Sequence, residues 1–166
     1  MENKQSIILD HNQIQHKIKR IAYQIYETNV RENEIIIAGI AENGYIFAEK
    51  LKMVLEDISD IKVTLCKVFM DKTNPNNTVS TDLRPEQYQN KSLVLADDVL
   101  NSGTALIYGV KHFLDVPLTK FKTAVLVNRN HKKYPIKADF KGISLSTSLH
   151  EHVTVTFGKQ DQATLA

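Results

Sequence analysis

Cysteine is almost absent from this sequence, because Cys66 is the only one in 166 residues. A single cysteine cannot form an internal disulfide, and it excludes a zinc site built from several cysteine ligands. Cys66 lies in the apolar stretch IKVTLCKVF. We therefore interpret it as a small buried hydrophobic residue and not as a nucleophile.

Long hydrophobic runs and a strong net charge are also missing. No segment approaches the ~18 apolar residues that a membrane span needs, and the opening MENKQSIILDHNQ lacks the apolar core of a signal peptide. These absences predict a soluble, cytoplasmic protein that does not bind membranes. The formal net charge is only +2, so bulk attraction does not imply nucleic-acid binding and any anion site must be built locally.

The composition and the spacing of apolar residues predict one α/β domain over residues 1–166. Hydrophobic residues make up 42% of the chain and charged residues 24%, which is typical of a single compact domain. Strands and helices alternate, which favours a central parallel sheet. The predicted elements are a helix capped by Asp10, helices over 45–58 and 104–114, strands over 35–40, 61–69, 92–96 and 122–127, and short β-rich runs over 139–157. Residues 71–90 lack periodicity and predict a long loop, either a flap over a site or a surface excursion.

The candidate site lies in residues 93–106, LVLADDVLNSGTAL. An apolar strand leads into Asp97 and Asp98, at the carboxyl end where ligands bind in open α/β sheets. Gly103 and the short side chains around it then open a helix, whose first N–H groups suit a phosphate. Carboxylates repel phosphate, but they accept hydrogen bonds from sugar hydroxyls and hold magnesium directly or through water. A phosphorylated ribose satisfies both halves of the segment.

Spacing alone leaves a structural alternative open for the same segment. Turns are rich in these residue types, so Asp97 and Asp98 could simply end a strand while Ser102 and Gly103 cap the next helix. Other phosphate-binding motifs are absent, because the sequence contains neither GxxxxGK(S/T) nor a GxGxxG after the first strand.

The motif VLADDVLNSGTA resembles the phosphoribosyl-pyrophosphate-binding motif of type I phosphoribosyltransferases. The stretches IILDHNQIQHKIKRIAYQI, IIIAGIAENGYIFAEKL and AVLVNRNHKKYPIKADFKGISLSTS are similar to the family of bifunctional pyrimidine operon attenuators and uracil phosphoribosyltransferases. The resemblance covers nearly the whole chain and is weakest over 71–90. It implies a type I phosphoribosyltransferase fold, with a central parallel sheet flanked by helices and a small β-rich hood.

The resemblance also implies roles for the site residues. Asp97 and Asp98 would be the catalytic pair that contacts the ribose hydroxyls and holds Mg2+. The loop around Gly103 would bind the 5′-phosphate, and the loop after the first strand would contact the pyrophosphate. The residues that we expect to bind substrate are Asn101, Ser102, Gly103, Thr104, Ala105, Ala41, Glu42, Asn43, Gly44 and Arg129. The implied partners are phosphoribosyl pyrophosphate and a nucleobase, and we expect a homo-oligomer, in the simplest case a dimer.

Three departures from the family pattern bear on turnover. Glu42 lies in a loop where the family has basic residues, and its carboxylate would repel pyrophosphate. The family's arginine after the second strand is missing, so Lys72 or Arg84 would have to replace it. Asn128 and Asn130 stand where the family has an aspartate and a glycine, which weakens the prediction of uracil as the base. We therefore expect weak or absent uracil phosphoribosyltransferase activity even though phosphoribosyl pyrophosphate binds.

A rival function is a non-catalytic regulatory module that senses ribose phosphates and binds RNA or a protein. The stretch from Lys111 to Lys141 is basic, with only Asp115 and Asp139 opposing its positive charges. We interpret it as a solvated surface, since no aromatic interleaving or RNA-recognition motif accompanies it. RNA binding remains the alternative, because the attenuator family binds messenger RNA.

Overall fold

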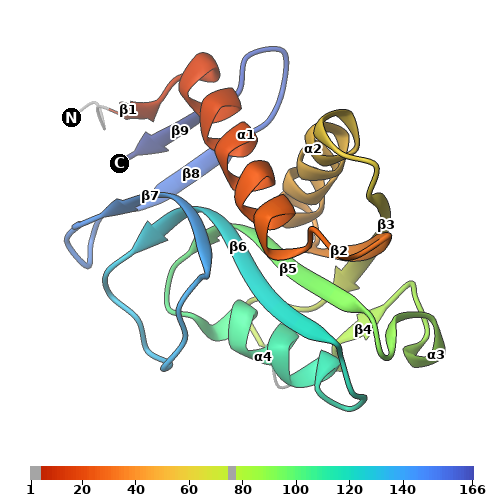
Figure 1. Cartoon of the computed structure of the whole chain (residues 1–166). Helices are drawn as coiled ribbons and strands as arrows, with labels where there is room; N and C mark the ends of the chain where they lie inside the picture. Colours follow the sequence, from red (N-terminus) through yellow and green to blue (C-terminus); the bar gives the residue numbers. More distant parts are fainter. Residues whose placement is uncertain (1–4, 75–77) are drawn as a thin grey trace.

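The computed structural model describes residues 5–74 and 78–166, and its centre is a six-stranded sheet (Figure 1). The strands are β2 (Glu34–Ile40), β3 (Lys62–Phe69), β4 (Ser80–Thr81), β5 (Ser92–Leu100), β6 (Lys120–Arg129) and β7 (Phe140–Leu145), in the spatial order β4-β3-β2-β5-β6-β7. All neighbours pair in parallel except β4, which runs antiparallel to β3 at one edge. The predicted central parallel sheet is confirmed.

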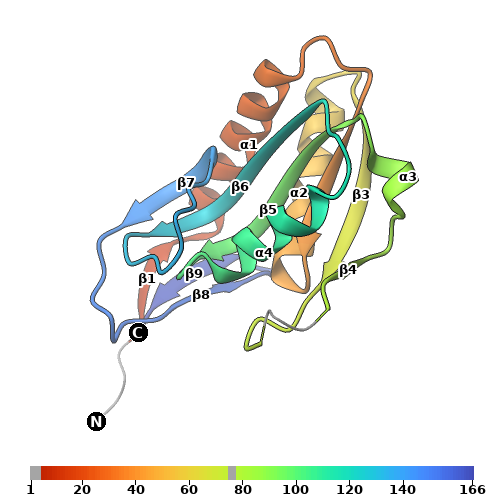
Figure 2. The same ribbon diagram turned by 90° about the horizontal axis from the view of Figure 1, so that it is seen from below.

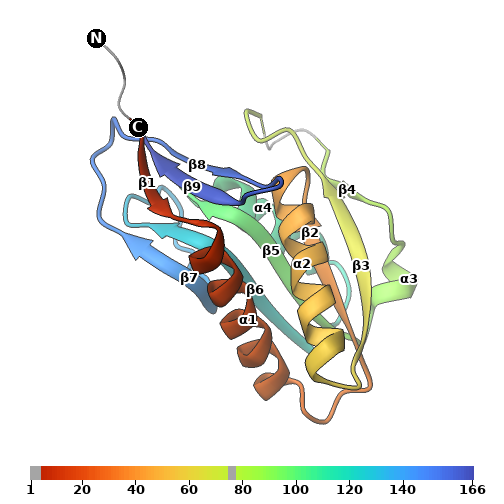
Figure 3. The same ribbon diagram turned by 90° about the horizontal axis from the view of Figure 1, so that it is seen from above.

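Helices cover both faces of this sheet. They are α1 (His11–Thr28), α2 (Asn43–Ile58), the short α3 (Pro85–Tyr88) and α4 (Thr104–Phe113). Figure 3 shows α1 and α2 over one face, and Figure 2 shows α4 over the other. The central strand β2 is therefore apolar on both sides: Ile35 and Ile37 pack in the core beneath α1 and α2, whereas Ile36 packs in the core beneath α4.

The predicted start of α1 is also confirmed. The Asp10 carboxylate accepts a hydrogen bond from the Gln13 N–H at 2.8 Å, and the Gln13 side chain accepts one from the Asp10 N–H at 2.9 Å. These two reciprocal bonds satisfy two backbone N–H donors at the start of the helix and fix where it begins. Its apolar stripe is then fully buried, through Ile14, Ile18, Ile21, Ala22 and Ile25.

A second, smaller sheet forms a hood beside the carboxyl ends of the central strands. It joins β1 (Ser6–Leu9), β9 (Gln162–Leu165) and β8 (Val153–Thr156) in antiparallel pairs, in the order β1-β9-β8 (Figure 3). Asp161, which is almost fully buried, anchors the hood to the helices: it accepts a hydrogen bond from Gln15 at 2.8 Å and lies 3.4 Å from the Lys50 ammonium. Burial alone would raise the pKa of Asp161, but the Gly158 N–H, Gln15 and Lys50 together hold it below the usual value.

Several predicted boundaries needed correction. β5 continues to Leu100, because its pairing with β6 extends to the Leu100 and Asn128 pair, so Asp97 and Asp98 lie inside the strand and not after it. The predicted loop 71–90 contains β4 and α3, and its residues 75–77 lie outside the described residues. The β-rich region 139–157 divides between two sheets, since β7 is the edge of the central sheet and β8 belongs to the hood.

The structure also bears on the predictions for Cys66 and for membrane-spanning segments. Cys66 is buried, and this burial raises the pKa of its thiol to about 12, so the residue has no thiolate available as a nucleophile at neutral pH. In the part of the chain that the structure describes, no helix is both long and apolar enough to cross a membrane.

Candidate functional site

The acid pair lies on β5 where the central sheet meets the hood. Asp97 is only 3% exposed, and its Oδ1 accepts a hydrogen bond from the Asp98 N–H at 2.9 Å. The Asp98 Oδ1 in turn accepts one from the Val99 N–H at 2.9 Å. Burial raises the pKa of Asp97 to about 7, with a further contribution from the neighbouring Asp98 charge, while Lys72 opposes the shift. The structure therefore places two adjacent carboxyl groups at the end of β5 that faces the hood.

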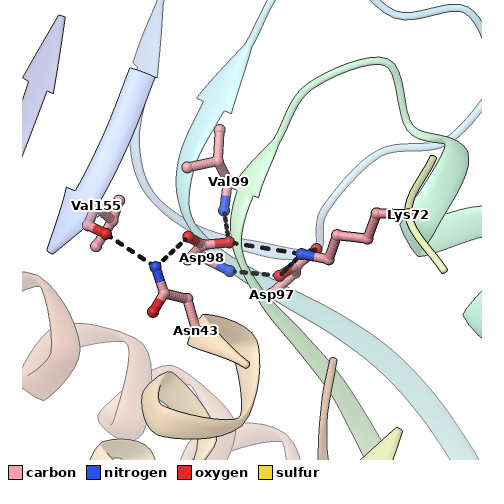
Figure 4. Close-up of polar contacts among 6 residues, drawn as sticks. All are labelled: Asn43, Lys72, Asp97, Asp98, Val99 and Val155. Carbon is pink, nitrogen blue, oxygen red and sulfur yellow. Dashed lines mark hydrogen bonds and ion pairs between the residues drawn. The ribbon is translucent and has the colours of Figure 1, made fainter. Parts of the chain in front are cut away.

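The Lys72 ammonium contacts both acids (Figure 4). Its Nζ is 3.0 Å from Asp97 Oδ1, 3.2 Å from Asp97 Oδ2 and 4.0 Å from Asp98 Oδ1. Lys72 follows β3, so the loop after this strand brings a cation to the acids across the intervening strand β2. The sequence suggested Lys72 as a replacement for the family's arginine, and the structure places its ammonium at the acid pair.

Asn43 connects the acids to α2 and to the hood (Figure 4). Its Nδ2 donates to Asp98 Oδ2 at 3.2 Å and to the Val155 carbonyl at 2.9 Å. The next residue, Gly44, allows this close approach, because a Cβ there would lie 2.8 Å from Asp97 Oδ1 and 2.9 Å from the Ala96 carbonyl oxygen. Both residues were predicted to bind substrate, and the structure shows contacts through which they position the acid pair.

A cavity of about 120 Å3 lies between the acids and the start of α4. Its lining includes Lys72, Asp97, Asn101, Ser102, Gly103, Thr104 and Ala105. Gly103 has φ +87°, the left-handed region, and is the N-cap of α4. The hydroxyl oxygens of Ser102 and Thr104 are 2.7 Å apart at the mouth of the helix. All five loop residues predicted to bind phosphate therefore face one cavity together with Asp97.

The segment that follows β6 supports this loop from behind. The Ser102 carbonyl accepts hydrogen bonds from the backbone N–H groups of Lys133 at 2.7 Å and Tyr134 at 3.1 Å. A Cβ on Gly103 would lie 2.6 Å from Ile136 Cγ2. Glycine is thus required here by the left-handed backbone and by Ile136.

The loop after β2 carries a charge pair that the sequence did not reveal. The Glu42 side chain is 77% exposed, and its Oε2 lies 3.4 Å from Lys67 Nζ. Lys67 comes from the adjacent strand β3, where it also lies over the rings of Tyr45 and Phe69. This lysine partly neutralises the glutamate that we expected to repel pyrophosphate. A lysine inside a largely apolar strand was the available signal, since its parallel pairing with β2 brings it beside the loop.

Ala41 belongs to the loop after β2, whereas Arg84 immediately precedes α3. Ala41 borders an open hollow of about 500 Å3 that also contacts Glu42, Phe69 and Asp71. Arg84 is the N-cap of α3, and between β4 and this cap the Asp82 N–H donates to the Lys67 carbonyl of β3. Arg84 does not line the cavity beside Asp97.

Arg129, predicted to bind substrate, is held by protein groups. Its guanidinium donates to the Thr147 hydroxyl at 2.8 Å, to the carbonyls of Ser148 at 3.2 Å and Glu151 at 2.6 Å, and to Asn101 Oδ1 at 3.2 Å. These bonds tie the phosphate loop to the segment that enters the hood. The structure therefore gives Arg129 a positioning role.

The acid pair fits a magnesium ion in the way that the resemblance implies. Carboxylate oxygens are hard ligands that Mg2+ accepts, and an ammonium already lies on both acids. Among the described residues, no group of three or more His, Cys, Asp or Glu side chains could hold a metal by itself. Magnesium commonly binds through one or two carboxylates with water and substrate oxygens completing its shell, so two acids suffice.

Comparison with known proteins agrees with this geometry. The chain is 31% identical over 170 residues to the bifunctional protein PyrR of Fusobacterium nucleatum, covering 97% of this chain and 96% of the relative. It is also 31% identical to the bifunctional protein PyrR of Bacillus subtilis, covering 96% of this chain and 94% of that protein.

Solved structures confirm the fold. A hypoxanthine-guanine phosphoribosyltransferase from Bacillus anthracis superposes with a TM-score of 0.74 at 20% identity, covering 88% of this chain and 85% of that chain. The hypoxanthine phosphoribosyltransferase of Trypanosoma cruzi gives a TM-score of 0.73 at 16% identity, covering 84% and 81%. The family model described as the phosphoribosyl transferase domain matches residues 4–162. Since this match spans nearly all of the chain, the protein belongs to the phosphoribosyl transferase domain family.

Proposed function

We propose that the protein binds phosphoribosyl pyrophosphate with Mg2+ at Asp97, Asp98 and the loop 101–105, and transfers the phosphoribosyl group to a nucleobase. One observation carries this proposal: a single cavity is bordered by a buried carboxylate on one side and by the N-terminus of α4 on the other. The first donors of a helix attract phosphate, whereas carboxylates accept from sugar hydroxyls, so the two sides suit the two ends of a ribose phosphate.

The residues divide the work of binding. The Ser102 and Thr104 hydroxyls and the backbone N–H groups at the start of α4 hold the 5′-phosphate. Asp97 and Asp98 accept hydrogen bonds from the ribose hydroxyls and would hold Mg2+. The bound ion supplies positive charge that stabilises the departing pyrophosphate.

The reaction is a substitution at the anomeric carbon of the ribose. A ring nitrogen of the base forms the new bond with its electron pair, the bond to the pyrophosphate oxygen breaks, and the nitrogen loses its proton. The transition state has oxocarbenium character, so the protein's contribution is to orient both reactants and to neutralise the leaving group. The hollow beside Ala41 and Glu42 is the place for the pyrophosphate, with Lys67 as its nearby cation.

We further propose a pyrimidine base, with uracil as the first candidate, a cytoplasmic location and a homo-oligomeric state such as a dimer. The base follows from the sequence resemblance to uracil phosphoribosyltransferases. Asn128 bears on the choice of base, because it stands where the family has an aspartate. It is 6% exposed, and its Nδ2 donates to the Ser144 hydroxyl at 3.1 Å. Its Oδ1 is the buried side-chain atom without a hydrogen-bond partner among the described residues.

A screen of nucleobases for pyrophosphate release tests the proposed activity. We expect slow turnover with uracil, because the pyrophosphate side offers Lys67 paired with Glu42 and has no basic residue in the loop 41–44. Ala41→Lys should raise kcat by about tenfold or more, since it adds a cation beside the leaving group. Asn43 is unsuitable for the same change, because its bonds to Asp98 and Val155 would be lost.

The matched control for this experiment is Val30→Lys. Val30 is 60% exposed at the far end of α1, so the variant adds the same charge away from the site. Rapid uracil turnover by the unmodified protein would contradict the expected deficit. An Ala41→Lys variant no faster than Val30→Lys would show that a missing cation is not its cause.

RNA binding is a second candidate function, favoured by one cluster of basic residues. Burial lowers the pKa of Lys132, and the positive charges of Lys141 and Lys137 lower it further, so these lysines lie near one another. Arg20 of α1 extends the cluster, because its guanidinium donates to the carbonyls of Lys141 at 3.1 Å and Gly142 at 2.6 Å. The sequence analysis interpreted the basic stretch as a solvated surface, and within it these residues form a local cluster of positive charge.

For arbitrary RNA we expect only weak retention in a filter-binding assay, with a steep loss as salt is raised. Such binding would arise from phosphate contacts alone. The double variant Lys137→Gln, Lys141→Gln should reduce both the retention and its salt dependence. Tight, sequence-selective binding that survives moderate salt would contradict this expectation and would make the regulatory function the stronger candidate.

A further inference from the structure

We propose that Lys72 is a tethered counter-ion that competes with divalent metal for Asp97 and Asp98, so that metal binds poorly unless the substrate accompanies it. This inference rests on the proposed function, because it takes the acid pair as the magnesium site. It concerns a residue outside the loops that bind the ribose phosphate. Figure 4 shows its side chain reaching across to the acids from the segment after β3.

The contact covers the accessible side of Asp97. Lys72 Nζ lies within 3.2 Å of both carboxylate oxygens. On the other side, Gly44 approaches so closely that even a Cβ would lie 2.8 Å from Asp97 Oδ1. Asp97 therefore meets backbone on one side and an ammonium on the other. A metal ion that binds this carboxylate from the cavity would therefore meet the Lys72 ammonium.

The same ammonium also affects Asp98. It lies 4.0 Å from Asp98 Oδ1, an oxygen that already accepts the Val99 N–H. Asn43 occupies the other oxygen, Oδ2, at 3.2 Å. Both acids thus accept from or lie close to protein groups, and the single positive charge among these groups is that of Lys72.

Charge decides which cation the pair holds. A divalent ion at the acids would lie only a few ångströms from the ammonium, and like charges that close repel strongly in a partly buried site. Lys72 and the metal therefore exclude each other. Lys72 is 41% exposed, whereas Asp97 is 4% exposed, so the lysine can leave without disturbing the core. Phosphoribosyl pyrophosphate brings negative charge for both cations, and its arrival makes the exchange favourable.

Binding of Mn2+ alone, followed by the loss of its free-ion signal in electron paramagnetic resonance, tests this competition without any turnover. The measurement is made at about pH 8. Lys72→Gln removes the charge and should tighten Mn2+ binding by about tenfold or more relative to the unmodified protein. Lys72→Arg keeps the charge and should bind Mn2+ as weakly as the unmodified protein does.

The control is Lys91→Gln, because Lys91 is 36% exposed and pairs with Glu34 at 2.9 Å, away from the acids. It should leave Mn2+ affinity unchanged. Adding Asp97→Asn and Asp98→Asn to Lys72→Gln should remove the gained affinity. Equal Mn2+ affinity in Lys72→Gln and the unmodified protein, including no binding by either, would overturn the inference.

A parallel titration with phosphoribosyl pyrophosphate and Mg2+ separates this inference from the proposed function. If neither the unmodified protein nor Lys72→Gln binds the substrate, the proposed function fails, whatever the Mn2+ result. If both bind the substrate but Mn2+ affinity does not respond to residue 72, only the competition fails.

Discussion

Replacing Asp97 and Asp98 together by asparagine should weaken the binding of phosphoribosyl pyrophosphate by about 100-fold or more and leave the fold intact. In the proposed complex each carboxylate accepts charge-assisted hydrogen bonds from the ribose, and such bonds contribute about 1.5–3 kcal/mol each. The asparagine amide is nearly the same size as the carboxylate, so the packing around it should be kept. Burial raises the pKa of Asp97 to about 7, so loss of its charge should change the free energy of unfolding less than it changes ligand binding. Isothermal titration calorimetry in the presence of Mg2+ measures the affinity, and circular dichroism measures the fold.

The matched control is the pair Asp57→Asn and Asp60→Asn, which also removes two carboxylates. Both residues are exposed around the end of α2, far along the helix from Asn43, where the acid pair is contacted. This control should bind the substrate normally. If the folded Asp97 and Asp98 variant binds as tightly as the control, the acids do not hold the ribose and the assignment of the site is wrong.

Gly103→Val should abolish detectable substrate binding and lower the free energy of unfolding by about 3 kcal/mol. Residue 103 has φ +87°, which a β-branched side chain does not adopt without strain, and its Cβ would lie 2.6 Å from Ile136 Cγ2. Relief of either conflict moves the N-cap of α4 and with it the donors that face the cavity. Calorimetric binding and chemical denaturation together measure the two effects.

Two further variants distinguish the causes. Gly158→Val is the control for the added side chain, because a Cβ at Gly158 has no atom within 4 Å, and it should change neither quantity appreciably. Gly103→Asn keeps a residue that tolerates the left-handed region, so it should retain more binding than Gly103→Val. Normal binding by a folded Gly103→Val variant would show that this loop does not hold the phosphate.

The sequence predicted the parts of the fold that depend on local pattern. The apolar run over 35–40 indicated a strand buried on both faces, and the Asp10 cap located the start of α1. The acids and the loop around Gly103 were predicted to act together, and one cavity does bring Asp97 and that loop face to face. These features follow from residues that are close in sequence, where periodicity and helix capping are informative.

Contacts between distant segments could not be predicted in the same way. Lys72 reaches Asp97 from another strand, and Lys67 meets Glu42 only because β3 pairs in parallel with β2. Arg129 was predicted to bind substrate, and the sequence did not show that its guanidinium also donates to Thr147. Side-chain partners of this kind depend on strand order and register, which a single sequence does not specify.

The hood has a consequence for the order in which the protein assembles. β1 and β9 come from opposite ends of the described chain, and Ser6 pairs with Leu165. Contacts at such long sequence separation carry a high loop-closure entropy and form late in folding. Because Asn43 joins Asp98 to Val155 of the neighbouring strand β8, the final alignment of the acids waits for this step. We therefore expect the central sheet to form before the hood, and the contact between Asn43 and Asp98 to reach its final alignment only when the hood has closed.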